Sequence, residues 1–162
     1  MTGRPLRQLS LHVATILCCV AIVGCKHTTA PSTASNPATE TFAASLGVNL
    51  AQMTKVSDVL YTQDLVVGTG ATAANGKNLG VTYTGWLVNG TQFDSNVGKA
   101  TFTFVLGFSE VIAGWDQGLV GMKVGGKRRL VFGSALGYGS SGYGAIPPNS
   151  TLIFDVQLLS SQ

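Results

Sequence analysis

The sequence predicts an α+β domain in which an antiparallel sheet of five or six strands curls over one short helix. Several stretches rich in β-branched and aromatic residues end at glycines or at an Asn-Gly turn, as strands and hairpins do. Helical spacing of apolar residues is convincing at one place, Trp115, Leu119 and Met122. The 21 glycines of the chain agree with many turns and little helix. One short helix on a sheet of this kind gives a two-layer domain.

The expected strands follow in order along the chain. The first, residues 59–67, stops at Gly68-Thr69-Gly70, and the second, residues 81–88, closes at Asn89-Gly90, a strong hairpin signal. Residues 101–106 alternate cleanly between apolar and polar side chains. After the helix, two more strands complete the sheet, at residues 127–132 and 151–159.

The first 24 residues have the layout of a signal peptide. Two arginines precede an apolar run from Leu9 through Val23 that is too short to span a membrane. Ile22-Val23-Gly24-Cys25 also resembles a bacterial lipobox, so Cys25 is expected to become the lipidated N-terminus of the mature chain. The alternative is an ordinary secretory signal with an incidental cysteine.

Residues 25–53 are predicted to be the lipidated cysteine followed by a flexible tether. From Lys26 to about Ser45 the chain is small, polar and contains two prolines, which leaves little to bury. About 20 to 25 flexible residues have a root-mean-square reach of roughly 25 to 30 Å. Phe42 and residues 46–53 are more apolar, and form either a strand or an arm on the domain. The folded domain is expected at residues 54–162.

Charge and composition exclude several classes of function. Counted from Cys25, the chain has eight Lys and Arg and seven Asp and Glu, so the net charge falls from +3 to +1. This charge gives no electrostatic reason to expect nucleic-acid binding. The domain contains no His and no Cys, because both histidines and all three cysteines precede residue 54. Nucleophiles activated by His, His-rich metal sites and disulfides are therefore not expected there, and neither is a cofactor.

Two glycine patterns are misleading. Residues 121–127 satisfy G-x-x-x-x-G-K, but Arg128 stands where a phosphate loop needs Ser or Thr, and a strand follows instead of a helix. Residues 137–142 spell G-x-G-x-x-G, but they lead toward Pro147-Pro148, which no helix accommodates there. Both are expected to be loops without phosphate chemistry.

A set of ordered motifs resembles the FKBP-type peptidyl-prolyl cis/trans isomerases over residues 57 to 160. The motifs are Tyr83-Thr84-Gly85, Phe93-Asp94, Val111-Ile112-Ala113-Gly114-Trp115-Asp116-Gln117-Gly118-Leu119, Gly137-Tyr138-Gly139, Ile146-Pro147-Pro148 and Phe154-Asp155-Val156. The resemblance implies an FKBP-like fold and an apolar, aromatic pocket in which X-Pro bonds rotate. It further implies folding assistance to proteins outside the cytoplasm, by an enzyme that the lipid anchor holds at the membrane.

The resemblance also implies the site residues. The catalytic set is Tyr83, Phe93, Asp94, Tyr138 and Phe154, and the substrate-binding set is Phe102, Val111, Ile112, Trp115 and Ile146. Trp115 is expected to form the floor of the pocket, while the Ile112 N–H and the Tyr138 hydroxyl bind substrate carbonyls. Asp94 is expected to act as an acceptor or to orient Tyr83; alternatively it is a turn residue that bonds its own backbone. Asp155 is expected to face solvent in a structural role.

Proline-containing polypeptides are the expected partners, together with macrolide inhibitors. Many family members have two bulky aliphatic residues before the Pro-Pro pair, whereas this chain has Ala145-Ile146 and a preceding loop about one residue shorter. Affinity for macrolides therefore stays open. The alternative from another class is a prolyl-peptide binding or chaperone module without useful turnover; a lipoprotein that uses the fold as a spacer would not explain the pocket residues.

Overall fold

The computed structural model describes residues 33–162, and its centre is one antiparallel sheet. Seven strands lie in the order β1-β2-β6-β7-β3-β4, with β5 also paired to β3. Their bounds are Thr54–Ser57, Leu60–Val66, Asn78–Leu87, Gln92–Ser95, Phe102–Val105, Lys127–Phe132 and Leu152–Ser161 for β1 to β7. The α-helix of the described residues, α1, covers Ala113–Gly118. The predicted α+β class with one short helix is confirmed, and the sheet is not closed.

The sheet has more strands than expected, because two short strands gave no clear signal. β1 has four residues with an exposed and intermediate burial pattern, and β4 also has four. Each contains one apolar residue, Val56 in β1 and Phe93 in β4, so neither shows the alternation on which a sequence prediction depends. Each of the five expected strands is present, and the largest shift of a boundary is three residues, at the start of β3, which begins at Asn78 instead of residue 81.

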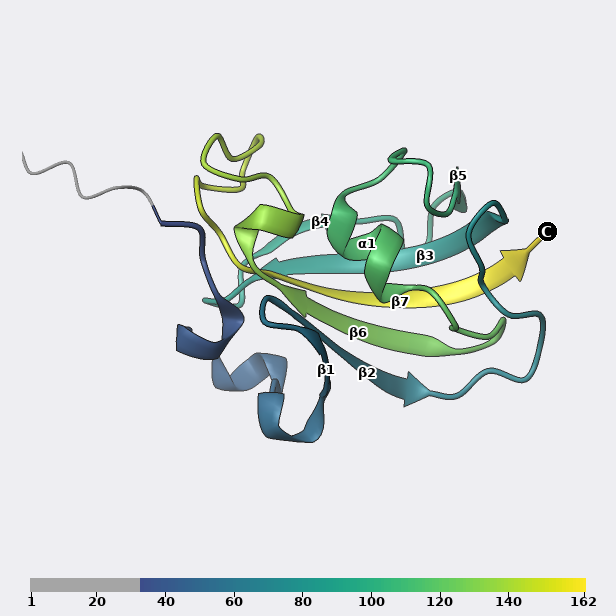
Figure 1. Ribbon diagram of the computed structural model, residues 1–162, viewed down its shortest axis with the longest axis horizontal. Helices are drawn as coiled ribbons and strands as arrows, with labels where there is room; N and C mark the ends of the chain where they lie inside the picture. The colour runs from purple at the N-terminus through teal and green to yellow at the C-terminus, as the bar shows by residue number, and fades with distance from the viewer. Residues whose placement is uncertain (1–32) are drawn as a thin grey trace, which may run out of the picture.

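Helix α1 approaches the sheet closely because it presents two glycines to β6. A Cβ on Gly114 would come within 2.7 Å of the Phe132 ring, and one on Gly118 within 2.8 Å of Leu130. The apolar stripe is longer than the helix: Leu119 is the C-cap and Met122 lies beyond it, yet both side chains are buried. Figure 1 shows α1 on the upper side of the sheet, and among the strands it contacts β2 and β6.

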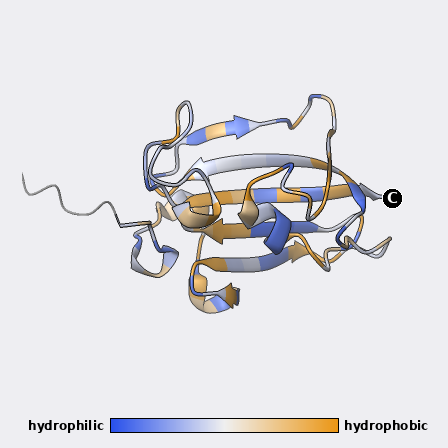
Figure 2. Ribbon diagram, turned by 45° about the horizontal axis from the view of Figure 1, so that its top comes forward, coloured by the Kyte–Doolittle hydropathy of each residue, from blue (hydrophilic) through white to orange (hydrophobic). Residues whose placement is uncertain are grey.

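Both faces of the central strands are buried, in two separate apolar clusters. In β6, Leu130 and Phe132 belong to the inner cluster beneath α1, while Val131 between them belongs to an outer cluster on the opposite face. β7 repeats the pattern with Phe154 inside and Ile153 outside. In Figure 2 these central strands carry the long apolar stretches. A strand covered on both faces has consecutive apolar residues, and here these are Leu130-Val131-Phe132 in β6 and Leu152-Ile153-Phe154 in β7.

The segment that covers the outer face is residues 33–53, here called the strap, and it departs from the expected flexible tether. The strap forms three 3₁₀ turns, Pro37–Thr39, Ala44–Leu46 and Leu50–Gln52, which lie below the sheet in Figure 1. Leu46 and Met53 are buried against Tyr61 and the outer faces of β6 and β7. Residues 33–45 are thus folded against the domain where a flexible tether was expected. Residues 46–53 form an arm on the domain, which is one of the two alternatives expected for them.

Asp155 is the second correction on this face. The side chain points away from the inner cluster as expected, but the strap covers it, and only 7% of the residue is exposed. Arg129 holds it through two hydrogen bonds, Nε to Oδ1 at 2.6 Å and Nη2 to Oδ2 at 3.0 Å. The same guanidinium donates to the Leu46 carbonyl at 2.6 Å. A charge at this depth is tolerable because it is paired in this bidentate geometry.

The predicted signal peptide and the lipidated Cys25 lie outside the described residues. Among residues 33–162, the helices are all too short to cross a bilayer.

Candidate active site

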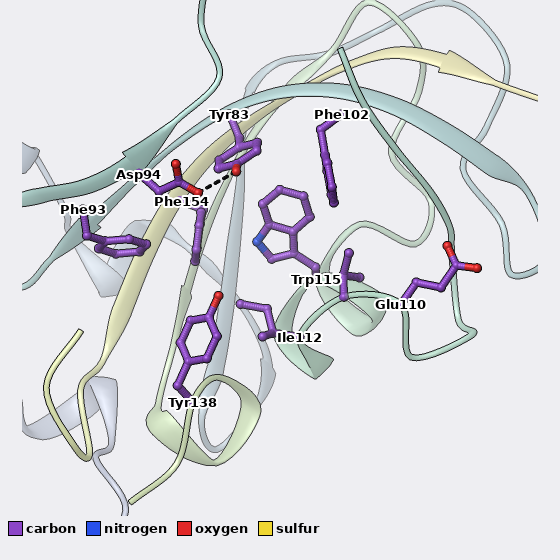
Figure 3. Close-up of a pocket in the computed structure, with 10 residues that line it drawn as sticks. Tyr83, Phe93, Asp94, Phe102, Glu110, Ile112, Trp115, Tyr138 and Phe154 are labelled. Carbon is purple, nitrogen blue, oxygen red and sulfur yellow. Dashed lines mark hydrogen bonds between the residues drawn. The ribbon is translucent and has the colours of Figure 1, made fainter. Parts of the chain in front are cut away.

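A pocket of about 370 Å³ lies at the inner face of the sheet, beside α1. Its size is within the range of small-molecule and peptide sites. Nine of the ten predicted catalytic and substrate-binding residues line it: Tyr83, Phe93, Asp94, Phe102, Val111, Ile112, Trp115, Tyr138 and Phe154. Figure 3 shows their side chains converging on one hollow, although they come from four strands, the segment before α1, α1 itself and the segment that carries Tyr138.

Trp115 forms the floor, as predicted. The residue is 3% exposed, and its ring makes edge-to-face contacts with Tyr83 at 5.0 Å and with Phe154 at 5.3 Å between centroids. Such pairs add to the stability gained from burial alone. Within the described residues its buried indole N–H has no hydrogen-bond acceptor. In Figure 3 the nitrogen lies on the side of the ring that faces Phe154, whose π-face is a weak acceptor.

The walls depend on a glycine in β3. Gly85 pairs with Asp94 across the β3–β4 hairpin, and a Cβ there would come within 2.7 Å of both the Phe93 and the Phe154 rings. Because Gly85 has no side chain, the two rings lie edge to face at 5.4 Å against the strand backbone. This is the physical reason for glycine in the Tyr83-Thr84-Gly85 motif.

Two hydrogen-bond donors reach the pocket without a partner in the described part of the chain. The Ile112 N–H precedes α1, where Ile112 is the N-cap with extended backbone angles (φ −60°, ψ 145°). Its carbonyl accepts from the Trp115 N–H at 2.9 Å, so the residue is held by the helix while its own N–H stays unpaired. The second donor is the Tyr138 hydroxyl, which points toward Tyr83 and Phe154 in Figure 3. Both are available to substrate carbonyls.

The loop before α1 is itself held by the helix. The Asp116 carboxylate accepts from the Gly107 N–H at 2.8 Å and from the Ser109 N–H at 3.1 Å. Ser109 has a positive φ of 57°, which is unusual for a residue other than glycine. Asp116 thereby fixes the loop that leads into Val111 and Ile112. The motif contained this aspartate, but the sequence carried no sign of its role, because its partners are backbone amides.

The Asp94 carboxylate accepts a hydrogen bond of 2.6 Å from the Tyr83 hydroxyl. This matches the expectation that Asp94 orients Tyr83, and the carboxylate makes no bond to its own backbone within residues 33–162. Burial raises the pKa of Tyr83 well above 10, and the bond to Asp94 adds to the shift. Burial also raises the pKa of Tyr138, with a further contribution from the charge of Asp94. Both phenols are therefore neutral donors at physiological pH.

Ile146 and Glu110 differ from the prediction. Ile146 does not line this pocket: it is 6% exposed and packs into the inner cluster, beside a smaller hollow of about 140 Å³ that Phe93, Asp94 and Tyr138 share. Glu110 lines the main pocket and was not predicted. Its Oε2 accepts from the Val105 N–H at 2.9 Å. Adjacency to Val111-Ile112 was the one signal that could have indicated it.

The described residues contain no candidate metal site. Within residues 33–162, His, Cys, Asp and Glu form no group of three that could hold a metal ion. The arrangement can instead enclose an apolar ring and bind the carbonyls on either side of it.

Together, the fold and the site define a small α+β domain with an apolar, aromatic pocket and a few fixed donors on its lining. The family model for FKBP-type peptidyl-prolyl cis-trans isomerases matches residues 70–159. The chain belongs to this family.

Curated relatives agree with this membership. An FK506-binding protein of Neisseria meningitidis serogroup B is 52% identical over 102 residues, which cover 62% of this chain and 94% of that protein. FK506-binding protein 4 of Dictyostelium discoideum is 55% identical over 102 residues, but these cover 28% of its length. The chain also spans less than a third of the proteins of the same name from Neurospora crassa and Rhizopus delemar, at 22% and 29%.

Solved structures show the same fold. FkpA from Escherichia coli aligns with a TM-score of 0.63 and 38% identity, over 68% of this chain and 52% of that one. A peptidyl-prolyl cis-trans isomerase from Pseudomonas syringae pv. tomato aligns with a TM-score of 0.62 and 31% identity, over 68% and 81% of the two chains.

Proposed function

We propose that this protein is an active peptidyl-prolyl cis/trans isomerase whose pocket takes the prolyl ring of a polypeptide. The observation that carries the proposal is an apolar pocket with two unpaired donors, the Ile112 N–H and the Tyr138 hydroxyl, on its lining. The family assignment supports it, as does the similarity to the Pseudomonas syringae protein, which is named a peptidyl-prolyl cis-trans isomerase.

The rate would come from differential binding and not from a nucleophile. Rotation about a peptide bond has a barrier of about 18 to 20 kcal/mol, because the planar amide is stabilised by resonance. Water solvates the charge separation of the planar form, whereas the twisted amide has a more ordinary carbonyl. A pocket of Trp115, Phe154 and Phe93 excludes water and so favours the twisted form relative to the planar one.

The polar groups then hold the chain on both sides of the rotating bond. The Ile112 N–H binds one substrate carbonyl, and Tyr138 donates its neutral hydroxyl to another. Asp94 holds Tyr83 in place at 2.6 Å and contributes negative charge at the rim. No proton transfer is needed, which agrees with a domain that contains no histidine.

The test is isomerisation of a proline tetrapeptide, or proline-limited refolding of a model protein, with the full chain in mild detergent. The full chain is required because the strap covers the outer cluster. Acceleration that scales with enzyme concentration is expected. Peptide binding without acceleration would instead establish a non-catalytic binding module. Absence of both binding and acceleration would exclude both functions.

We further propose that the protein acts outside the cytoplasm as a lipoprotein anchored through Cys25, where it assists the folding of secreted chains. Support comes from the Ile22-Val23-Gly24-Cys25 pattern after an apolar run. Ser35, a strap residue that is hydrogen-bonded to the domain, is ten residues beyond Cys25. Ten residues span at most about 36 Å, so the domain would lie near the lipid surface.

The anchor has a direct test. The wild-type protein should take up a labelled fatty acid and need detergent to leave the membrane, because each buried CH₂ of an acyl chain adds about 0.8 kcal/mol. Cys25→Ser should leave an uncut precursor without label. Processing and labelling of the Cys25→Ser chain would show that the anchor is elsewhere.

We also propose that the pocket binds FK506, the macrolide after which the relatives are named. Competition of FK506 with a proline peptide tests this, and Ala145→Ile tests whether the small residue in the shortened loop weakens the affinity.

A further inference from the structure

The strap makes a specific contact with the segment that carries Tyr138, here called the Tyr138 loop, residues 133–139. Two hydrogen bonds join Ser35 and Ser134 in both directions. The Ser35 N–H donates to Ser134 Oγ at 3.0 Å, and the Ser134 N–H donates to Ser35 Oγ at 2.8 Å. The two residues are 99 positions apart in the sequence. Each side chain thus satisfies the backbone amide of the other.

This contact is closely packed, and its Ser134 side is buried. Ser134 is 1% exposed, and Pro37 of the strap is buried beside it. A Cβ on Gly133 would come within 2.1 Å of the Ser35 carbonyl oxygen. Glycine at position 133 is therefore what allows the two backbones to approach. A partly buried polar pair in tight contact fixes the position of both segments, because its loss leaves two backbone amides without these partners.

Ser134 is in turn hydrogen-bonded to the backbone on both sides of Tyr138. The Ser134 carbonyl accepts from the Gly137 N–H and from the Gly139 N–H, each at 2.9 Å. These two amides flank Tyr138 in the sequence. The position of Ser134 therefore sets the backbone on either side of Tyr138 and, with it, the direction of the hydroxyl toward the pocket (Figure 3).

We propose that Ser35 is a positioning residue for the isomerase reaction: through Ser134 it holds the Tyr138 hydroxyl where it meets the substrate. This inference rests on the proposed function. It gives the strap a second role besides covering the outer cluster, because one end of it reaches a residue of the pocket.

The test is a double-mutant cycle between Ser35→Ala and Tyr138→Phe in the full chain. Loss of one hydrogen bond corresponds to a factor of about two to ten, so Ser35→Ala should lower kcat/KM about two- to tenfold. In the Tyr138→Phe background, Ser35→Ala should lower it by less than about twofold, because the hydroxyl that Ser35 positions is already absent. Ser134→Ala should behave in the same way.

Thr39→Ala is the matched control. It also removes one hydroxyl from the strap, but that hydroxyl donates to the Asn36 carbonyl at 2.9 Å and does not touch the Tyr138 loop. Its kcat/KM should equal that of the wild type in both backgrounds. Gly133→Ala is a stronger probe of the close approach; if it does not fold, the two serine variants carry the test.

Three outcomes would overturn the inference: an equal loss from Ser35→Ala with and without the Tyr138 hydroxyl, no loss at all, or an equal loss in Thr39→Ala. The wild-type rate separately tests the proposed function. If the wild type binds a proline peptide without isomerising it, the same cycle is measured as peptide affinity by tryptophan fluorescence, since Trp115 lines the pocket.

Discussion

Replacing Tyr138 by phenylalanine removes one atom from the pocket and leaves its wall in place. The ring is stacked on Tyr143, with centroids 5.2 Å apart and planes inclined by 15°, and phenylalanine keeps that contact. Since the hydroxyl has no partner within residues 33–162, its removal leaves no protein group unsatisfied. The free energy of unfolding should therefore change by less than about 0.5 kcal/mol, as for surface substitutions away from special features.

The cost should appear in catalysis instead. One neutral hydrogen bond to a substrate carbonyl contributes about 0.5 to 1.5 kcal/mol, which corresponds to a two- to tenfold loss of kcat/KM. The assay is tetrapeptide isomerisation of Tyr138→Phe and wild type at several temperatures, with a thermal melt of both proteins. An unchanged rate would refute the role of the hydroxyl, and a rate that falls only in proportion to a lower melting temperature would show that Tyr138 is a core residue.

Five further predictions concern the pocket, the strap and the composition of the domain. Asp94→Ala should lower kcat/KM at least as much as Tyr138→Phe, because it frees Tyr83 and opens the rim; a smaller loss in the same isomerisation assay would contradict this. Burial raises the pKa of Tyr83 and Tyr138 above 10, so activity should be flat between about pH 6 and 9. The stability that the neutral phenols contribute should be complete below about pH 10 and lost only as pH rises through their folded-state pKa values, which urea unfolding at pH 7 and pH 11 measures. Leu46→Ala should lower the free energy of unfolding by about 2 to 5 kcal/mol in urea, whereas a loss below 1 kcal/mol would mean that the strap is not part of the fold. Chelators and thiol reagents should leave the rate unchanged, and inhibition by either would point to a metal or cysteine role that the domain sequence does not predict.

Much of the architecture could be predicted because the signals are local. The alternation in residues 101–106, the Asn89-Gly90 turn and the apolar run in residues 151–159 report the conformation of their own backbone. The strands β1 and β4 were not predicted because each contains one apolar residue and is stabilised by pairing with a neighbouring strand, which no short window of sequence contains.

The strap shows the same limit for a polar segment. Its first part has the composition of a linker, and its large apolar residues, Phe42, Leu46, Val48, Leu50 and Met53, lie within its last twelve residues. They find partners because the outer faces of β6 and β7 expose Val131 and Ile153, far away in the chain. Flexibility inferred from composition was wrong because burial depends on the surface that the rest of the fold offers.

The sequence by itself determined the strand and turn pattern and the absence of His and Cys from the domain. Through the family resemblance it also indicated nine residues that line the pocket, eight of them within the motifs. Tertiary structure decided how these residues meet: the Gly85 gap that accepts two aromatic rings, the carboxylate of Asp116 that holds the loop before α1, and the pairing of Ser35 with Ser134. The physical reason is the range of the interactions. Propensity and turn preference act between neighbours in the chain, whereas close packing and hydrogen bonds to backbone amides join residues that only the folded sheet brings together.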